Sequence, residues 1–71
     1  MFSKNVERLR ERLGMSQKEL GEMVGVSQGM ISHIEKGLKN PSLGLAFRIA
    51  TALHTTVDAM QSDHLFDDDG A

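Results

Sequence analysis

Apolar side chains recur at intervals of three and four residues along most of the chain, and no stretch alternates apolar and polar positions as a strand would. This spacing is typical of amphipathic α-helices. A serine or threonine precedes each apolar stretch, where its hydroxyl can accept a hydrogen bond from a free N–H group in the first turn of a helix. The pattern predicts an all-α chain with five helices: 4–13 capped by Ser3, 17–24 capped by Ser16, 28–36 capped by Ser27, a fourth capped by Ser42, and a short fifth that begins at Thr56.

Each expected helix has one apolar face, and together these faces predict a single core. Leu, Ile, Val and Phe supply 18 of the 71 residues, about a quarter, which is enough for such a chain to fold. The side chains assigned to the core are Val6, Leu9 and Leu13 on the first helix, Leu20, Met23 and Val24 on the second, Ile31 and Ile34 on the third, Ala46, Phe47, Ile49, Ala50 and Leu53 on the fourth, and Val57 and Met60 on the fifth. The expected fold is therefore a compact five-helix bundle.

The composition argues against several classes of function. The 71 residues are about half the usual span of one domain, which leaves no room for an enzyme-sized cleft. Cysteine is absent, so disulfides, thiolate metal sites and cysteine nucleophiles are excluded. No two histidines are four residues apart, and we expect neither a metal site nor a cofactor. No apolar run is long enough for a membrane span or a secretory signal, so we expect a cytoplasmic protein that is not an enzyme.

Charge is distributed unevenly along the chain. Residues 1–57 carry eight lysines and arginines against five glutamates, a formal charge of +3, whereas residues 58–71 carry five aspartates and no lysine or arginine, a formal charge of −5. A basic body favours a polyanionic partner, and the acidic end lowers the pI without making that body acidic. We therefore divide the chain into a folded domain, 1–62, and an acidic C-terminal tail, 63–71.

Only Gly25, Val26 and Ser27 join the second expected helix to the third. So short a connection forces the two helix axes to cross steeply and closely, which is the geometry of a helix-turn-helix. Gly25 can adopt the left-handed conformation that the turn needs, and Gly21 leaves space where the next helix crosses. The core that the two helices share is expected to contain Leu20, Val24, Val26, Ile31 and Ile34.

Two segments carry a more specific signal, LRERLGMSQKELGEMVGVSQGMISHIEKG and NPSLGLAFRIATAL. From Val6 to Met60 the chain resembles the Cro/CI-type (Xre) helix-turn-helix family of transcriptional regulators. The resemblance implies a lambda-repressor-like domain of five helices that binds double-stranded DNA, with its third helix in the major groove. Two residues depart from the family pattern: Gly21 stands where alanine is usual, and His54 stands where a glycine ends the fourth helix in many relatives.

The outward face of the third expected helix is the candidate base-reading surface. Because Ile31 and Ile34 must point inward, Gly29, Ser32 and His33 are expected to point outward. His33 is long enough to touch a base edge or a phosphate, and a solvated surface histidine is the alternative.

Two glutamines open the second and third helices. The matching pair acts together in the family, and the resemblance implies that Gln17 holds a DNA phosphate and braces Gln28, which reads adenine through two hydrogen bonds. Two solvated glutamines are the alternative. After the third helix, Lys36, Lys39 and Asn40 surround a turn that can hold phosphates at the edge of the groove, unless it is only a solvated turn. The expected base contacts are thus Gln28, Gly29, Ser32 and His33, and the expected phosphate contacts are Gln17, Lys36, Lys39 and Asn40.

The resemblance also implies an ion pair between Arg10 and Glu35, which would join the first helix to the end of the third. Such a pair adds little net stability by itself, but removal of one partner leaves the other charge in a poorly hydrated place. Its expected role is therefore structural.

A second apolar stripe on the fourth helix, Leu45 and Ile49, suggests a subunit interface. Leu45 occupies a position that is usually polar in the family. Together with Val57 and Met60 on the fifth helix, and with Leu65 and Phe66 just before the acidic run, the stripe can form a two-fold interface. The alternative is that the tail folds back over its own monomer.

These features lead to two hypotheses of different classes. The first is a homodimeric repressor or dual regulator that binds a pseudo-palindromic operator in double-stranded DNA. The second is a protein-interaction module, such as the antitoxin of a toxin–antitoxin pair, whose tail binds a protein partner while the helix-turn-helix regulates its own gene. Co-purification with a partner from the native host would distinguish them, because operator binding fits both.

Overall fold

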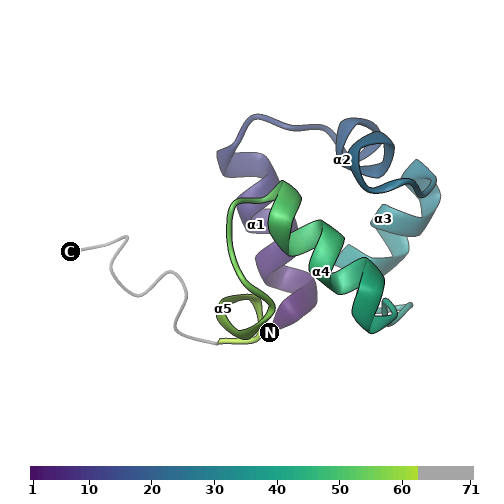
Figure 1. Cartoon of the computed structure of the whole chain (residues 1–71). Coiled ribbons are helices and arrows are strands. Elements are labelled where there is room, and N and C mark those ends of the chain that lie inside the picture. Colours follow the sequence, from purple (N-terminus) through teal and green to yellow (C-terminus); the bar gives the residue numbers. More distant parts are fainter. Residues whose placement is uncertain (63–71) are drawn as a thin grey trace.

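The computed structural model describes residues 1–62, in which all regular structure is helical. The five helices are α1 (Phe2–Arg12), α2 (Gln17–Val24), α3 (Gln28–Glu35), α4 (Leu43–Ala52) and α5 (Val57–Met60) (Figure 1). The five helices predicted from the sequence are thus confirmed, with small differences at their ends. Across these residues, no helix combines the length and the apolar character needed to cross a lipid bilayer.

The start of α1 differs from the prediction. The helix begins at Phe2, and Met1 stands at its N-cap without a side-chain hydrogen bond. The assignment of Ser3 as the cap is wrong, because the N–H of Asn5 already donates to the Met1 carbonyl at 3.1 Å and places Ser3 inside the first turn. The other three predicted caps are confirmed, since each hydroxyl accepts a hydrogen bond from the N–H three residues further on: Ser16, Ser27 and Ser42. Thr56, where the fifth helix was expected to begin, caps α5 in the same way.

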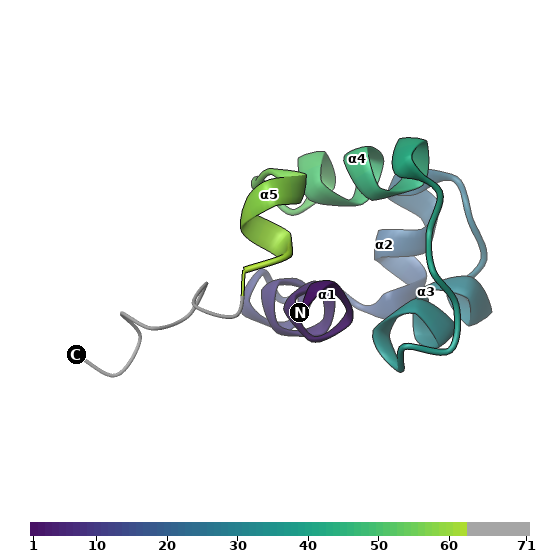
Figure 2. The same cartoon turned by 90° about the horizontal axis from the view of Figure 1, so that it is seen from below.

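All five helices contribute to one core. In Figure 2, α1 is seen nearly end-on, α4 and α5 lie above it, and α2 and α3 lie to its right. The largest fully buried side chains are Val6 on α1, Leu20 on α2, Ile31 and Ile34 on α3, Ile49 on α4, and Met60 on α5. Burial of an aliphatic side chain of this size contributes about 1.5–3 kcal/mol. The core therefore fixes each helix, including the side of α3 that must face inward.

A buried asparagine, which sequence reasoning did not single out, connects the two ends of the domain. Asn5 is 5% exposed, and its amide nitrogen donates to the carbonyls of Met60, at 2.6 Å, and Ser62, at 2.9 Å. These carbonyls lie at and just beyond the end of α5, where helical partners are lacking. The signal in the sequence was its place four residues before Leu9, on the inward side of α1. Asn5 thus ties the end of α5 to α1, close to the N-terminus (Figure 1).

The buried face of α4 is rotated from the predicted one. Leu45 and Ile49, one turn apart, are 7% and 0% exposed and align with Leu53 on the core side. Phe47 points away from the core and is 56% exposed, so its assignment to the core is wrong. The helix is apolar on two adjacent sides, and the apolar residues of each side recur at helical intervals, so the pattern alone does not show which side is buried.

Two further residues assigned to the core are exposed. Leu13, at 44% exposure, is the C-cap of α1 with a φ of −83° and a ψ of 1°, so it no longer follows the helical face. Met23, at 58% exposure, points outward because α2 buries Leu20, Gly21 and Val24 instead. The glycine occupies the inward position next to the crossing helix, which a hydrophobic pattern does not reveal.

His54 has the left-handed conformation considered for it, with a φ of 60°. It closes α4, where its N–H donates to the Thr51 carbonyl at 3.1 Å and the next N–H, of Thr55, donates to the Ala50 carbonyl at 2.9 Å. A residue with a Cβ atom is strained in this conformation, although histidine tolerates it better than most.

We expect His54→Gly to raise the free energy of unfolding by about 1 kcal/mol, because glycine adopts this φ without steric cost. For a domain of this size, the gain corresponds to a rise in Tm of about 4–8 °C. Thermal unfolding of the wild-type protein, His54→Gly and His54→Ala would measure it. The alanine variant lacks the imidazole but keeps the Cβ atom, so an equal gain in both variants would place the strain in the imidazole and contradict a backbone origin.

Candidate nucleic-acid interface

The turn between α2 and α3 is fixed at both ends by backbone geometry. Gly25 has a φ of 81°, and the N–H groups of Gly25 and Val26 both donate to the Gly21 carbonyl, at 2.8 and 2.9 Å. This left-handed glycine ends α2. Two residues later, the Ser27 hydroxyl accepts a hydrogen bond from the Met30 N–H at 3.1 Å and begins α3. The predicted helix-turn-helix connection is therefore present.

Gly21 lies where the turn approaches α2 most closely. A Cβ atom at this position would be 2.7 Å from the carbonyl oxygen of Val26 and 3.3 Å from the backbone carbon and oxygen of Ser27. All three atoms belong to the backbone, which cannot move aside as a flexible side chain can. The space that the glycine was expected to leave is thus filled by the turn itself.

An arginine on α4 supports this turn, although sequence reasoning did not single it out. The Nε of Arg48 donates to the carbonyl of Val24 at 3.1 Å. Val24 is the last residue of α2, where carbonyls lack helical partners. The available signal was that Arg48 is the one lysine or arginine beyond Lys39. The contact connects α4 to the end of α2.

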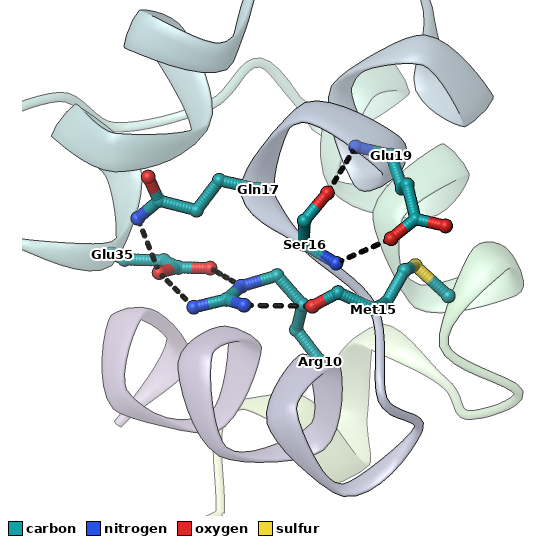
Figure 3. Close-up of polar contacts among 6 residues, drawn as sticks. All are labelled: Arg10, Met15, Ser16, Gln17, Glu19 and Glu35. Carbon is teal, nitrogen blue, oxygen red and sulfur yellow. Dashed lines mark hydrogen bonds and ion pairs between the residues drawn. The ribbon is translucent and has the colours of Figure 1, made fainter.

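Arg10 and Glu35 form the ion pair that the resemblance implied (Figure 3). The Nε of Arg10 lies 2.7 Å from Oε2 of Glu35 and Nη2 lies 3.1 Å from Oε1, so the contact is bidentate. The Nη1 group donates to the Met15 carbonyl at 2.8 Å. The two side chains are only 11% and 1% exposed. The hydrogen bond to Glu35 raises the pKa of Arg10, so the guanidinium stays charged and joins α1, α3 and the loop before α2.

Gln17 belongs to the same cluster. Its Nε2 donates to Oε1 of Glu35 at 3.0 Å, a contact that was not foreseen (Figure 3). Because a carboxylate only accepts hydrogen bonds, the amide nitrogen must face Glu35, and the amide oxygen points away from it. Glu35 thus fixes the orientation of the first side chain of α2. The contacts of Gln17 with a phosphate and with Gln28 stay predictions.

A capping box formed by Ser16 and Glu19 stabilises the first turn of α2, next to the cluster of Arg10, Gln17 and Glu35. The Ser16 hydroxyl accepts a hydrogen bond from the Glu19 N–H at 3.0 Å, and the Glu19 carboxylate accepts one from the Ser16 N–H at 2.9 Å (Figure 3). The backbone contact lowers the pKa of Glu19, because it stabilises the charged form. The start of α2 is therefore held on the side of the molecule that carries Gln17.

The residues expected to contact bases lie on the side of α3 that the core leaves free. Ile31 and Ile34 are both fully buried. Three of the expected base contacts are exposed, namely Gln28, Gly29 and His33. The fourth, Ser32, is half-buried. The inward and outward sides of α3 are therefore those that the sequence predicted.

The connection after α3 brings polar and basic side chains to one end of this helix. The N–H of Gly37 donates to the Ile34 carbonyl at 3.1 Å, and the N–H of Leu38 donates to the His33 carbonyl at 2.9 Å, so the helix ends here. The expected phosphate contacts in this connection are all exposed: Lys36, Lys39 and Asn40. Exposed lysines beside a helix of this kind suit a polyanion.

The predicted subunit interface is wrong at three of its four described residues, and the fourth, Val57, is half-buried. Leu45, Ile49 and Met60 are 7%, 0% and 0% exposed, because their side chains already fill the core of the monomer. Leu65, Phe66 and the acidic tail lie outside the described residues.

Apolar side chains also line two hollows on the surface of the described domain. A groove of about 450 Å³ lies between α2 and α4, and its lining includes Met23 and Phe47. A pocket of about 370 Å³ is lined by residues of α1, α4, α5 and the loop after α3. Phe2, Leu43 and Val57 contribute apolar surface to this pocket, and Leu43 is 69% exposed.

Known proteins share this architecture. The Helix-turn-helix family HTH_3 matches residues 6–60. An uncharacterized HTH-type transcriptional regulator of Methanothermobacter thermautotrophicus is 45% identical over 62 residues, which cover 87% of this chain and 87% of that protein.

Two solved DNA complexes contain the same fold. The P22 c2 repressor in complex with synthetic operator 9T superimposes with a TM-score of 0.81 and 28% identity, over 84% of this chain and 91% of the repressor chain. The second is SinR, the master regulator for biofilm formation, in complex with DNA. It superimposes with a TM-score of 0.80 and 28% identity, over 87% of this chain and 100% of that chain. Since the family match spans most of the folded residues and the relative is similar over nearly its whole length, the chain belongs to the helix-turn-helix family of Cro/CI (Xre) type, whose members are DNA-binding transcriptional regulators.

Proposed function

We propose that this protein is a transcriptional repressor that binds a pseudo-palindromic operator as a homodimer, with α3 in the major groove. The observation that carries the proposal is the free side of α3, where Gln28 and His33 are exposed opposite the buried Ile31 and Ile34. A helix held in this way by its inner face presents its outer side chains to base edges. The likeness to the P22 c2 repressor in its operator complex supports the repressor role.

Base reading in this proposal is centred on Gln28. Its amide offers a donor and an acceptor, which match the N7 acceptor and the N6 donor of adenine in the major groove. Ser32 and His33 lie one turn further along and reach neighbouring positions. Gln17, oriented by its bond to Glu35, contacts a phosphate beside the start of α2.

In this proposal, the residues after α3 contribute DNA affinity that does not depend on the base sequence. Lys36, Lys39 and Asn40 hold phosphates at the groove edge, and each neutralised phosphate releases counterions. These contacts place the domain on the duplex but do not distinguish one base from another.

We expect Gln28→Ala to lower the affinity for the preferred operator by about 1–3 kcal/mol and to relax the choice of base at one position in each half-site. Binding to random duplex DNA should hardly change. Lys39→Ala should weaken binding to operator and to random DNA alike and make the salt dependence shallower, because a phosphate contact carries no base identity.

Both variants would be titrated with operator and with random DNA across a series of salt concentrations. Lys18→Ala removes an exposed lysine of α2 that has no assigned contact, and serves as the control for loss of one positive charge. A uniform loss for Gln28→Ala, together with an altered base preference for Lys39→Ala, would reverse the assigned roles.

The homodimer requires a surface that shares only Val57 with the interface predicted from the sequence. We place it at the pocket that contains Phe2, Leu43 and Val57, because Leu43 is the most exposed apolar side chain of α4 and the loop after α3 borders the same pocket. A two-fold axis beside the end of α3 allows both copies of α3 to face one side of the DNA, about 34 Å apart. Residues 1–62 form the domain that dimerises in this proposal, and the acidic tail, 63–71, lies beyond it.

We expect Leu43→Glu to shift the dimer towards monomer, since it places a charge in the interface. Phe47→Glu is the matched control, because Phe47 is also an exposed apolar residue of α4 but lines the other groove. Sedimentation equilibrium at tens of micromolar would report the distribution of species. A wild-type protein that is only monomeric would contradict the homodimer, and a dimer disrupted by Phe47→Glu alone would move its interface to the α2–α4 groove.

A further inference from the structure

Gly29 occupies the most outward position of α3. At about 100° of rotation per residue, Ile31 and Ile34 lie about 200° and about 140° around the helix from Gly29, so the direction midway between them is about 170° away. Both isoleucines are fully buried. The outer side of α3 faces away from α1, α2 and α4 (Figure 2). The most outward position of the helix, which would enter a groove most deeply, therefore carries no side chain.

The fold itself does not require glycine at this position. Gly29 lies within α3 and is not among the glycines with positive φ. A Cβ atom built on it meets nothing nearer than the Ser27 hydroxyl oxygen, at 3.8 Å. Glycine is the least favourable residue for a helix after proline. The folded domain gives no reason for glycine here, whereas close approach of another molecule does.

The missing side chain leaves a notch, whose floor is the backbone of Gly29 and whose rim is formed by Gln28, Ser32 and His33. The outward surface of the floor is the Cα atom of Gly29, because the N–H and C=O groups of a helix point along its axis. The rim carries hydrogen-bonding groups. On the major-groove edge of a base pair, the one apolar projection next to hydrogen-bonding atoms is the 5-methyl group of thymine.

We infer that the notch at Gly29 receives the 5-methyl group of a thymine in each operator half-site, and that the absence of a side chain makes Gly29 a specificity-determining residue. The inference rests on the proposed function, because it needs α3 in the major groove. A Cβ atom at residue 29 would occupy the space of the methyl group, so alanine at this position disfavours thymine. Gln28 on the rim then contacts an adjacent base.

Gly44 provides a matched control. Gly29 and Gly44 are each the second residue of a helix that follows a serine cap, Ser27 or Ser42, whose hydroxyl accepts a hydrogen bond from the third N–H of the helix. A Cβ atom at Gly44 meets nothing within 4 Å. Gly29→Ala and Gly44→Ala should therefore raise Tm by similar amounts, up to about 5 °C, and neither should disturb the fold.

The test uses the operator that the wild-type protein enriches from random duplex DNA. Dissociation constants are measured for the wild-type protein, Gly29→Ala and Gly44→Ala on this operator and on versions with deoxyuridine in place of each thymine in turn. At one thymine per half-site, removal of the methyl group should weaken wild-type binding by about fourfold, the value of one buried methyl group. Gly29→Ala should bind the thymine operator about tenfold more weakly and regain affinity with uracil at that same position, since the two methyl groups compete for one space.

Gly44→Ala should respond to uracil as the wild-type protein does. Equal affinity of the wild-type protein and Gly29→Ala for the thymine operator would overturn the inference. So would a loss in Gly29→Ala that no uracil substitution repairs, because the notch would then not hold a thymine methyl group. Failure of the wild-type protein to enrich any sequence would instead contradict the proposed function itself, and the inference with it.

Discussion

Glu35→Ala is expected to lower the free energy of unfolding by about 3–5 kcal/mol, because it leaves the Arg10 guanidinium buried without its partner. The Glu35 side chain is 1% exposed and accepts three hydrogen bonds, two from Arg10 and one from Gln17. The free energy of unfolding of a native protein is typically about 5–15 kcal/mol in total. The loss is a large part of this value, so the variant should be largely unfolded on mild heating. Urea unfolding followed by circular dichroism measures the loss.

Two further variants separate the buried charge from other effects. Glu22→Ala removes an exposed carboxylate of α2 and should leave the unfolding midpoint nearly unchanged. The double variant Arg10→Met with Glu35→Leu removes both charges, and it should recover much of the stability that Glu35→Ala loses, since apolar side chains of similar volume can replace a buried pair. An unchanged midpoint for Glu35→Ala would show that the pair is not a structural connection between α1 and α3.

Gly21→Ala is expected to destabilise the domain by about 1–3 kcal/mol, the usual effect of forcing an extra methyl group into a packed site. Alanine would gain up to about 1 kcal/mol in helix propensity. The clash outweighs this gain, because the new Cβ atom would lie 2.7 Å from the carbonyl oxygen of Val26. The helix must then move away from the turn, which also shifts the start of α3.

The effect of Gly21→Ala can be measured by the same unfolding experiment, with Gly44→Ala as a control in open space. The control should be at least as stable as the wild-type protein. Greater stability of Gly21→Ala would mean that the turn accommodates a methyl group, as the alanine usual at this position in the family suggests. Chemical shifts of the α3 amides would report whether the recognition helix has moved.

Local sequence signals predicted much of the fold. Serine and threonine caps and the glycines after α1, α2 and α3 set most helix ends, because these signals act within a single turn. The three residues between α2 and α3 predicted the helix-turn-helix for the same reason. The pairing of Arg10 with Glu35 came from the family resemblance, since nothing local connects residues on separate helices.

The errors arose where two solutions satisfied the same periodicity. On α4, a stripe through Leu45 and Ile49 and a stripe that included Phe47 both have helical spacing, and packing against the other helices chose the first. This choice also removed Leu45 and Ile49 from the expected subunit interface. Two hydrogen bonds were also missed, the one from Gln17 to Glu35 and the one from Asn5 to the Met60 carbonyl. Both depend on how separate helices pack against one another, which the periodicity along one helix does not encode.

In the proposed function, α3 reads a specific DNA sequence as one half of a two-fold dimer. Repeated selection of bound fragments from random duplex DNA by the wild-type protein, followed by footprinting of the enriched site, tests this role. We expect one enriched sequence made of two inverted half-sites, with centres about one helical turn, or about 10–10.5 base pairs, apart. Recovery of fragments that share no sequence, or of a single half-site protected without its inverted partner, would contradict it.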